Sequence, residues 1–265
     1  MRMCSIASGS SGNCIYVGTD TTHVLVDTGI SGRRIEKGLR ELDLSLQDID
    51  AILITHEHAD HISGLGVLLR KREIPVYATK GTIARMKASR SLGDVPGDVF
   101  QEIEEDENFI VKDVTAMPMK ISHDAAQPVA YRFRHDRKTA GIITDLGVYN
   151  DYTVECLKGL DVVFLEANHD VRMLETGPYP YYLKQRILGE RGHLSNESSG
   201  RFLSRIMHGG MKGIVLCHLS KENNLAELAY ETVRVELTMA DNEFGGSDFP
   251  ITVARRDEIS EIIHI

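Results

Sequence analysis

A polar stretch, "THEHADHISG" at residues 55–64, continues directly from the apolar run "DAILIT" and restricts the possible folds of the chain. The apolar run predicts a fully buried strand, whereas the histidines and acidic residues that follow are too polar for a core. On a near-extended segment, residues two apart point the same way. We therefore expect His56 and His58 to offer imidazoles to one metal ion, while Asp60 and His61 turn toward a neighbouring ion.

Residues that can bind metals also follow three later apolar strands. His123 comes after "AMPMKIS", Asp145 after "AGIIT" and His218 after "GIVLC". Together with the loop, these strand ends predict a dinuclear site in which Asp145 bridges the two ions. The predicted ligands are His56, His58 and His123 for one ion, and Asp60, His61 and His218 for the second. Nitrogen and oxygen ligands without cysteine suit zinc, manganese or iron, and the sequence does not choose among these metals.

The rest of the chain alternates strand-like and helix-like segments in both halves. Strands are indicated by "NCIYVGTD", by "THVLVDTG" and by the alternating apolar and polar residues of "PVAYRFRHD". Helices are indicated by "GRRIEKGLREL", with Ser31 as its N-cap, and by "NESSGRFLSRIMHGG". No internal repeat or low-complexity linker divides the chain, which is 42% hydrophobic. The pattern predicts an α/β (α+β) fold, a single domain over residues 1–265 in which helices flank mixed β-sheets.

The N-terminal segment, the cysteines and the charge indicate the surroundings of the protein. The opening "MRMCSIASGSSGN" lacks an apolar stretch for a signal peptide, and no run approaches the roughly 20 apolar residues of a membrane helix. We therefore expect a cytoplasmic protein without membrane contact. The four cysteines show no C-x-x-C spacing, so buried free thiols are expected. The net charge of −9 opposes nonspecific attraction to nucleic acid, although basic segments such as "YYLKQRILGER" leave local contacts open.

The string H-x-H-x-D-H after an apolar strand resembles the metallo-β-lactamase superfamily, whose fold is an αβ/βα sandwich with a dinuclear metal site at one edge. Within it, the chain is similar to the YycJ/WalJ (VicX) family through "GSSGNC", "THEHADHISGL", "SHDAAQPVAYRF", "LEANHD", "GPYPYYLKQRILGERGHLSNE" and "CHLSKENN". That family is described as metal-dependent nuclease-like hydrolases. The resemblance implies a DNA exonuclease with 5′→3′ polarity. Flavodiiron relatives carry an acidic residue at the position of His58, so the histidine here favours hydrolysis.

Two divalent ions can activate a water and clamp the attacking and leaving oxygens of a phosphodiester displacement. Asp60 is expected to orient the attacking hydroxide in addition to binding a metal. His169, in "LEANHD" at the end of another apolar strand, is the predicted general acid, with Glu166 to orient it. A ligand role for His169 is left open. Glu57 is expected to point away from the ions.

Four further residues are predicted to contact the substrate. Ser195 and Ser220 each follow "HL" ahead of a predicted helix, so both are also expected as N-caps. His193 leaves a glycine after a basic helix, and its role is left open among contact with a substrate phosphate, support of a metal ligand and a place on the surface. Asn13, in the turn-forming "SGSSGN", is the fourth residue, and its simplest role is to hold that turn together.

The length of the chain and one basic segment bear on the substrate. About 73 positions separate Asp145 from His218, too few for the second domain of β-CASP nucleases, so the site should be open. An open site suits single- or double-stranded DNA ends, but equally a small phosphodiester. "YYLKQRILGERGH" fits either base stacking with phosphate contact or an ordinary packed helix. The alternatives to a nuclease are a cyclic phosphodiesterase, a glyoxalase II-like thioesterase and a binding protein without catalysis. Oligomeric state is not predicted.

Overall fold

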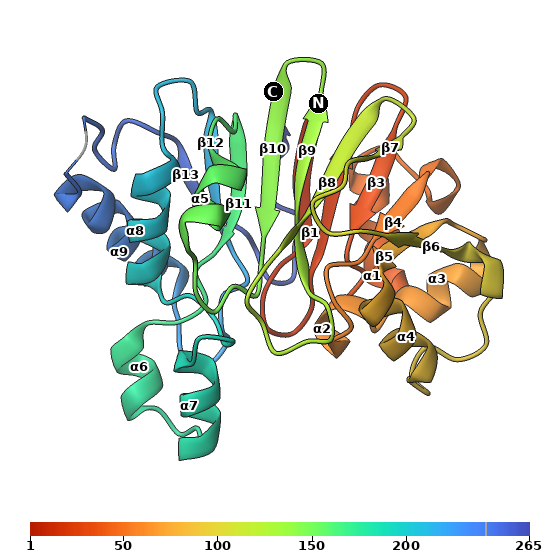
Figure 1. The fold of residues 1–265 in the computed structure, drawn as a ribbon, viewed down its shortest axis with the longest axis horizontal. Helices are drawn as coiled ribbons and strands as arrows, with labels where there is room; N and C mark the ends of the chain where they lie inside the picture. Colours follow the sequence, from red (N-terminus) through yellow and green to blue (C-terminus); the bar gives the residue numbers. More distant parts are fainter. Residues whose placement is uncertain (242) are drawn as a thin grey trace. The chain divides into compact units, whose positions relative to one another are not determined.

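The computed structural model describes residues 1–241 and 243–265, which cluster into two compact units. Unit 1 consists of Met1–Lys120, Ala125–Asp136 and Arg255–His264, and unit 2 of Ile121–Asp124, Arg137–Ala254 and Ile265. Each unit combines strands with helices, as the ribbon in Figure 1 shows. The single domain expected over residues 1–265 stays a prediction.

Unit 1 contains a mixed sheet with the strand order β14-β1-β2-β3-β4-β5-β6. Its strands are β1 (Arg2–Ala7), β2 (Cys14–Gly18), β3 (His23–Val26), β4 (Ala51–Leu53), β5 (Val76–Thr79), β6 (Phe100–Ile103) and β14 (Ile263–His264). β1 to β3 pair antiparallel, whereas β3 to β6 pair in parallel. The interior strand β4 is buried throughout, as is typical of a parallel strand covered on both faces. The histidine loop therefore starts from a rigid strand.

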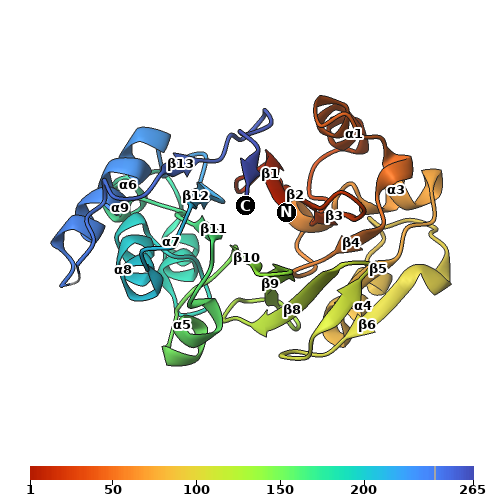
Figure 2. The same ribbon diagram turned by 90° about the horizontal axis from the view of Figure 1, so that it is seen from above.

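Helices pack against this sheet. They are α1 (Gly32–Glu41), α2 (Ala59–Ile62), α3 (Leu65–Lys71) and α4 (Lys80–Ala88), with short 3-10 turns η1 (Leu46–Asp48) and η2 (Gly97–Val99). α1 buries Ile35 and Leu39 and lies beside α3, which Figure 2 shows from above. Ser31 is the N-cap residue of α1, as predicted, but its side chain makes no capping hydrogen bond.

An antiparallel part of unit 1 supports the histidine loop. It consists of β7 (Phe109–Val111), β8 (Val114–Lys120) and β9 (Val129–His135). Tyr131 and Phe133 are buried and Arg134 is exposed, which confirms the half-buried strand expected from "PVAYRFRHD". The Tyr131 hydroxyl donates to the carbonyl of Ile54, and the N–H of Val129 donates to the carbonyl of Thr55. β9 thus fixes the backbone where the loop begins.

Unit 2 is built on parallel strands in the order β10-β11-β12-β13. They are β10 (Lys138–Ile143), β11 (Val162–Glu166), β12 (Gly213–Cys217) and β13 (Ile251–Val253). β11 and β12 are buried at every position. Because the carboxyl ends of parallel strands meet at one edge of a sheet, Asp145, Glu166 and His218 emerge there together.

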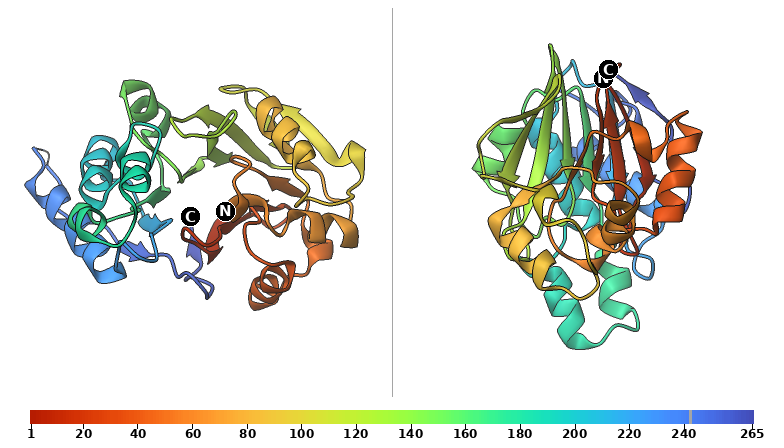
Figure 3. Two further views of the ribbon diagram at one scale, coloured as in Figure 1. Left: turned by 90° about the horizontal axis from the view of Figure 1, so that it is seen from below. Right: turned by 90° about the vertical axis from the view of Figure 1, so that its right-hand side faces the viewer.

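The helices of unit 2 are α5 (Asp151–Leu157), α6 (Val171–Thr176), α7 (Tyr181–Leu188), α8 (Asn196–Ile206) and α9 (Ala226–Met239). α8 packs on α9 and on α5. α6 and α7 form a hairpin whose helices lie side by side in Figures 1 and 3. The Lys184 ammonium of α7 ties this hairpin together by donating to the carbonyls of Glu175 and Gly177. Across residues 1–241 and 243–265, no helix has the length and apolar character needed to span a bilayer.

Within the described residues, the four cysteines lie outside disulfide bonds, as expected. Cys4, Cys14 and Cys217 are buried, and Cys156 is half-buried. Burial raises the pKa of the Cys4 thiol to about 12, so it stays protonated at neutral pH. A protonated thiol is a poor metal ligand and nucleophile. Cys4 is therefore neither a metal ligand nor a nucleophile.

Candidate metal centre

The predicted histidine loop changes from extended to helical within the motif. His56 is buried, and His58 is the N-cap residue of α2. Asp60 and His61 therefore lie in a helical turn, so the prediction of a near-extended segment is wrong for these two residues. Successive residues of a helix differ by about 100° in direction. The side chains of Asp60 and His61 therefore point in other directions than those of His56 and His58. The Nε2 atom of His61 lies 3.6 Å from Oδ2 of Asp60.

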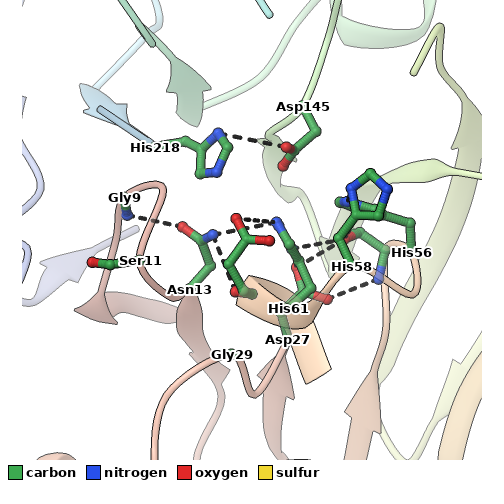
Figure 4. A network of polar contacts seen from close by, with 12 residues as sticks. Gly9, Ser11, Asn13, Asp27, Gly29, His56, His58, His61, Asp145 and His218 are labelled. Atoms are coloured by element: carbon green, nitrogen blue, oxygen red, sulfur yellow. Dashed lines mark hydrogen bonds and ion pairs between the residues drawn. The ribbon is translucent and has the colours of Figure 1, made fainter. Parts of the chain in front are cut away.

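Asp27, which the sequence did not single out, sets the orientation of His61. Its Oδ2 atom accepts hydrogen bonds from Nδ1 of His61 at 2.7 Å and from the Thr55 hydroxyl at 2.8 Å. Its Oδ1 atom accepts from the backbone N–H of Thr55 at 2.9 Å. Figure 4 shows this buried network. Asp27 directly follows the apolar strand β3, so the strand-end pattern that selected His123 would also have found it.

His56 and His58 converge on each other. Nδ1 of His56 lies 3.0 Å from the Thr55 hydroxyl, and its Nε2 lies 3.0 Å from Nδ1 of His58. Two nitrogens that bind one zinc ion at about 2.0–2.1 Å with tetrahedral angles lie about 3.3 Å apart. The pair drawn in Figure 4 therefore has close to the separation that two ligands of one ion require.

Asn13 connects the N-terminal turn to the histidine loop. Its Oδ1 atom accepts hydrogen bonds from the N–H of Gly9 at 3.0 Å and from the Ser8 hydroxyl at 3.4 Å. Its amide donates to the carbonyl of Asp60 at 3.3 Å and lies 3.3 Å from Nε2 of His61. Asn13 thus holds the turn together, and its role in substrate binding stays a prediction.

In unit 2, the predicted ligands His123 and Asp145 lie close together. Nδ1 of His123 donates to the carbonyl of Gly192 at 3.1 Å, and its Nε2 lies 3.6 Å from Oδ1 of Asp145. The guanidinium of Arg191 donates twice to the His123 carbonyl, at 3.1 and 3.0 Å. Both predicted ligands are buried, so the fold fixes their orientation.

Glu166 holds two histidines with one carboxylate oxygen. Its Oε1 atom accepts hydrogen bonds from Nδ1 of His193 at 2.7 Å and from Nδ1 of His218 at 2.8 Å. Its Oε2 atom accepts from the N–H groups of Leu146 and Leu194. Burial by itself would raise the pKa of Glu166, but the two imidazoles lower it to about 2. The carboxylate therefore stays charged and fixes both rings.

His169 is not oriented by Glu166 in the way that the sequence suggested. Its side chain is buried, and neither ring nitrogen has a hydrogen-bond partner among the described residues. Burial lowers the pKa of His169 to about 4, so the ring is neutral at neutral pH. The carboxylate of Glu166 holds His193 and His218 instead. The sequence could not decide this, because Glu166 and His169 are close along the chain and His193 is distant.

The two serines of the "HLS" repeats differ in structure. Ser195 is the N-cap of α8, and its hydroxyl accepts from the N–H of Ser198 at 3.2 Å, as predicted. Ser220 instead accepts from the N–H of Asn223, and α9 begins only at Ala226. The prediction of Ser220 as a helix N-cap is therefore wrong, because a turn separates it from the helix. Contact of either serine with substrate stays a prediction.

Strand-end residues of both units adopt a left-handed backbone conformation. Asp27, Asp145 and His218 have φ angles of 60°, 55° and 54°. This region is costly for residues other than glycine, and such strain persists where the surrounding structure holds a functional side chain in place. The conformation turns the chain after each of these buried strands.

The donor set of unit 2 fits a divalent metal ion. In unit 2, ligand atoms of Asp145, Glu166, His193 and His218 lie within 4.8 Å of one another. Acceptors hold Nδ1 of three buried histidines, His61, His123 and His218, as carboxylates and carbonyls do for metal-binding imidazoles. Imidazole nitrogens with carboxylate oxygens suit divalent transition metals.

Comparison with known proteins agrees with this fold. The family model described as "Beta-lactamase superfamily domain" matches residues 22–218. Exodeoxyribonuclease WalJ of Streptococcus pneumoniae is 41% identical over 260 residues, which cover 98% of this chain and 96% of that protein. Exodeoxyribonuclease YycJ of Bacillus anthracis is 40% identical over 228 residues, 86% of each protein. The crystal structure of the metallo-β-lactamase fold protein YhfI from Bacillus subtilis aligns with a TM-score of 0.72 at 15% identity, over 98% of both chains.

The fold and the donor residues define a metal-dependent hydrolase of the metallo-β-lactamase class. The predicted αβ/βα sandwich, with mixed β-sheets flanked by helices, is thereby confirmed. Within this class, the chain belongs to the WalJ/YycJ family of the β-lactamase superfamily. The prediction of that family from the sequence motifs is also confirmed.

Proposed function

We propose that this chain is an exodeoxyribonuclease that hydrolyses phosphodiester bonds at single- or double-stranded DNA ends. The main support is its identity of 40–41% to two exodeoxyribonucleases, over 86–98% of the chain. Cleavage in the 5′→3′ direction follows from the family resemblance. We also propose that the protein acts in the cytoplasm.

We propose two divalent ions as cofactors, with zinc, manganese and iron as the alternatives. Their ligands are His56, His58, Asp60, His61, His123, Asp145 and His218, in the assignment predicted from the sequence and family. The structural observation that supports this proposal is that Nδ1 of His61, His123 and His218 each donates a hydrogen bond to an acceptor. Nε2 is therefore the proposed metal-binding atom of these three histidines. Ions bound there supply Lewis-acid stabilisation and lower the pKa of a water molecule.

His193 is our proposed proton donor, with Glu166 as the residue that positions it. The carboxylate holds Nδ1, so the proton at Nε2 moves to the leaving oxygen as the P–O bond breaks. Burial alone would lower the pKa of His193, but the Glu166 carboxylate raises it above its ordinary value. His169 is the second candidate, and a weaker one, because a neutral imidazole has no proton of suitable acidity to give.

Exposure separates the residues proposed for substrate contact. The His193 side chain is partly exposed, whereas the residues Asn13, Ser195 and Ser220 are buried. We therefore propose His193 as the first contact of a DNA phosphate, with the other three as supporting residues. Asp60, whose side chain is 26% exposed, is proposed to orient the attacking water as well as to bind a metal.

A nuclease assay tests the proposal. DNA labelled at either the 5′ or the 3′ end is incubated with the protein and Mn²⁺, and the first released products give the polarity. We expect degradation from the 5′ end, more than 100-fold slower for His58→Ala. Glu57→Gln is the matched control in the same loop, because the Glu57 carboxylate bonds to the N–H of Ala126. Equal cleavage by His58→Ala would sink the assignment.

The same preparations separate the nuclease from the other hydrolases. Turnover of bis-p-nitrophenyl phosphate or of a glutathione thioester, with no cleavage of any DNA, would replace our proposal by a small-molecule hydrolase. Absence of all three activities in a metal-loaded protein would favour a binding protein without catalysis.

A further inference from the structure

Two tyrosines at the start of α7 are exposed although they are large aromatic residues. Tyr181 is 76% exposed and Tyr182 is 75% exposed, and the residue that α7 buries is Ile187. A buried aromatic side chain removes about 150–250 Å² from water, so leaving two of them in solvent forgoes a large stabilisation. The core of unit 2 therefore does not account for this pair.

The next turn of α7 is bonded to the segment that carries a proposed metal ligand. Arg186 donates to the carboxylate of Asp124 through Nε at 2.5 Å and Nη2 at 3.1 Å. Asp124 directly follows His123, and its Oδ1 atom lies 3.4 Å from Nε2 of His123. The side of α7 that presents Arg186 thus faces the His123 segment.

Helix geometry places only one of the tyrosines on this side. At 3.6 residues per turn, Tyr182 is rotated by about 40° from Arg186, whereas Tyr181 is rotated by about 140°. Tyr182 lies about 6 Å from Arg186 along the helix axis, which corresponds to about two nucleotides of a stacked strand at 3.4 Å each. Tyr182 therefore lies on the side of α7 that presents Arg186, about one helical turn away from it.

The far end of α7 is also fixed to the site. The N–H of His193 donates to the carbonyl of Ile187 at 3.0 Å, and the N–H of Gly192 donates to the carbonyl of Gly189 at 2.8 Å. Gly192 in turn accepts from Nδ1 of His123. These bonds fix the C-terminal end of α7 relative to His123 and His193. Because a helix is rigid, the start of α7, with Tyr182, also has a defined position relative to them.

The charge of α7 matches a nucleic acid. Its sequence "YYLKQRIL" contains Lys184 and Arg186 and no acidic residue, in a chain whose net charge is −9. The Asp124 carboxylate pairs with Arg186, so Lys184 supplies the net positive charge beside the tyrosines. Exposed aromatic rings beside cationic side chains are the combination that binds single strands, since every base has a face that can stack. This combination favours a nucleic acid over a second copy of this acidic chain.

We propose that Tyr182 binds a single DNA strand by stacking on a base beside the bond to be cleaved. The inference rests on the proposed nuclease function and adds to it a residue that determines preference for unpaired ends. Stacking needs the ring and not the hydroxyl, so Tyr182→Phe should act like the wild type.

The test compares Tyr182→Ala, Tyr182→Phe and Tyr181→Ala in the full chain. We expect Tyr182→Ala to raise KM for a single-stranded oligonucleotide about tenfold, equal to about 1.4 kcal/mol, with little change in kcat. Tyr182→Phe and the equally exposed Tyr181→Ala should change KM less than twofold. Turnover of bis-p-nitrophenyl phosphate should be the same for all, because that compound has no base to stack.

Binding of a fluorescent oligonucleotide in the His58→Ala background gives a readout that does not depend on cleavage. The same tenfold loss should appear there as a higher Kd for the Tyr182→Ala variant. An unchanged KM and Kd, or equal losses for Tyr181→Ala and Tyr182→Ala, would overturn the inference. A dimeric wild type that becomes monomeric with Tyr182→Ala would do the same and assign the pair to self-association. A wild type that binds DNA but cleaves none would contradict only the nuclease function.

Discussion

The Oδ2 atom of Asp27 lies 2.7 Å from Nδ1 of His61, so a buried carboxylate at the end of β3 holds an imidazole of the loop that follows β4. The same oxygen accepts from the Thr55 hydroxyl, and Thr55 in turn contacts Nδ1 of His56. One carboxylate therefore orients two of the proposed metal ligands. Asp27 therefore orients ligands of the histidine loop, although it lies far from that loop in sequence.

Asp27→Asn should weaken metal binding without abolishing the fold. Losing a carboxylate that orients a metal-binding histidine typically reduces metal affinity by about 10–100-fold. Competition with a chromogenic chelator would measure this loss. Asp50→Asn is the matched control, because Asp50 bonds to the N–H of His23 and to Lys112. Equal affinities for the two variants would show that Asp27 does not support the site.

Gly29→Ala should disrupt the helical part of the motif. A Cβ atom at Gly29 would lie 1.6 Å from the carbonyl oxygen of Asp60, which is backbone and cannot rotate away. Overpacking costs about 1–3 kcal/mol, and we expect the upper end here, with reduced metal retention. Gly209→Ala, where the nearest atom lies 3.8 Å away, should leave both stability and metal content unchanged in denaturant titrations and elemental assays.

Ser195→Ala should lower the free energy of unfolding by about 1 kcal/mol, since its hydroxyl caps the N–H of Ser198. Ser31→Ala should have a smaller effect, because Ser31 makes no capping bond in α1. Urea unfolding of both variants checks the difference. Equal destabilisation would mean that the hydroxyl of Ser195 adds nothing to α8.

Asp161→Asn should make the stability of the protein less dependent on acid pH. Burial by itself would raise the pKa of Asp161, but the N–H of Thr139 and the Lys212 ammonium lower it. A lowered folded-state pKa adds stability above the ordinary value of about 3.9, and this stability disappears as the pH falls through the folded-state pKa. We expect wild type to exceed the variant by about 1 kcal/mol at pH 7, and this difference to shrink as the pH falls below about 3.9. A constant difference across this range would contradict the assignment.

The sequence was sufficient to predict the fold and the candidate ligands at the strand ends, for a physical reason. Buried parallel strands require apolar runs, and polar side chains directly after them must collect at one sheet edge. This selected Asp145 and His218 as well as the loop. His123 follows the antiparallel strand β8 and was found from the apolar run before it. Asp27 obeys the same pattern at the end of β3, so it was within reach of the sequence.

Other features depend on tertiary contacts that leave no local signal. The partners of Glu166 come from segments far away in sequence, so its choice of His193 and His218 over the nearby His169 was not predictable. Likewise, α9 begins only at Ala226 because Ser220 belongs to a turn, in which its hydroxyl accepts from the N–H of Asn223. The strand β14 spans only two residues and forms by pairing with β1, which explains why no pattern marked it.

The most direct test of the two-metal hydrolase is a titration of the metal-free protein with Mn²⁺ while DNA cleavage is followed. We predict no cleavage without metal, and a rate that rises until about two equivalents are bound and then stays constant. Elemental analysis of the saturated protein should give the same two ions per chain. Full cleavage in excess chelator, or a rate that is complete at one equivalent, would contradict the account.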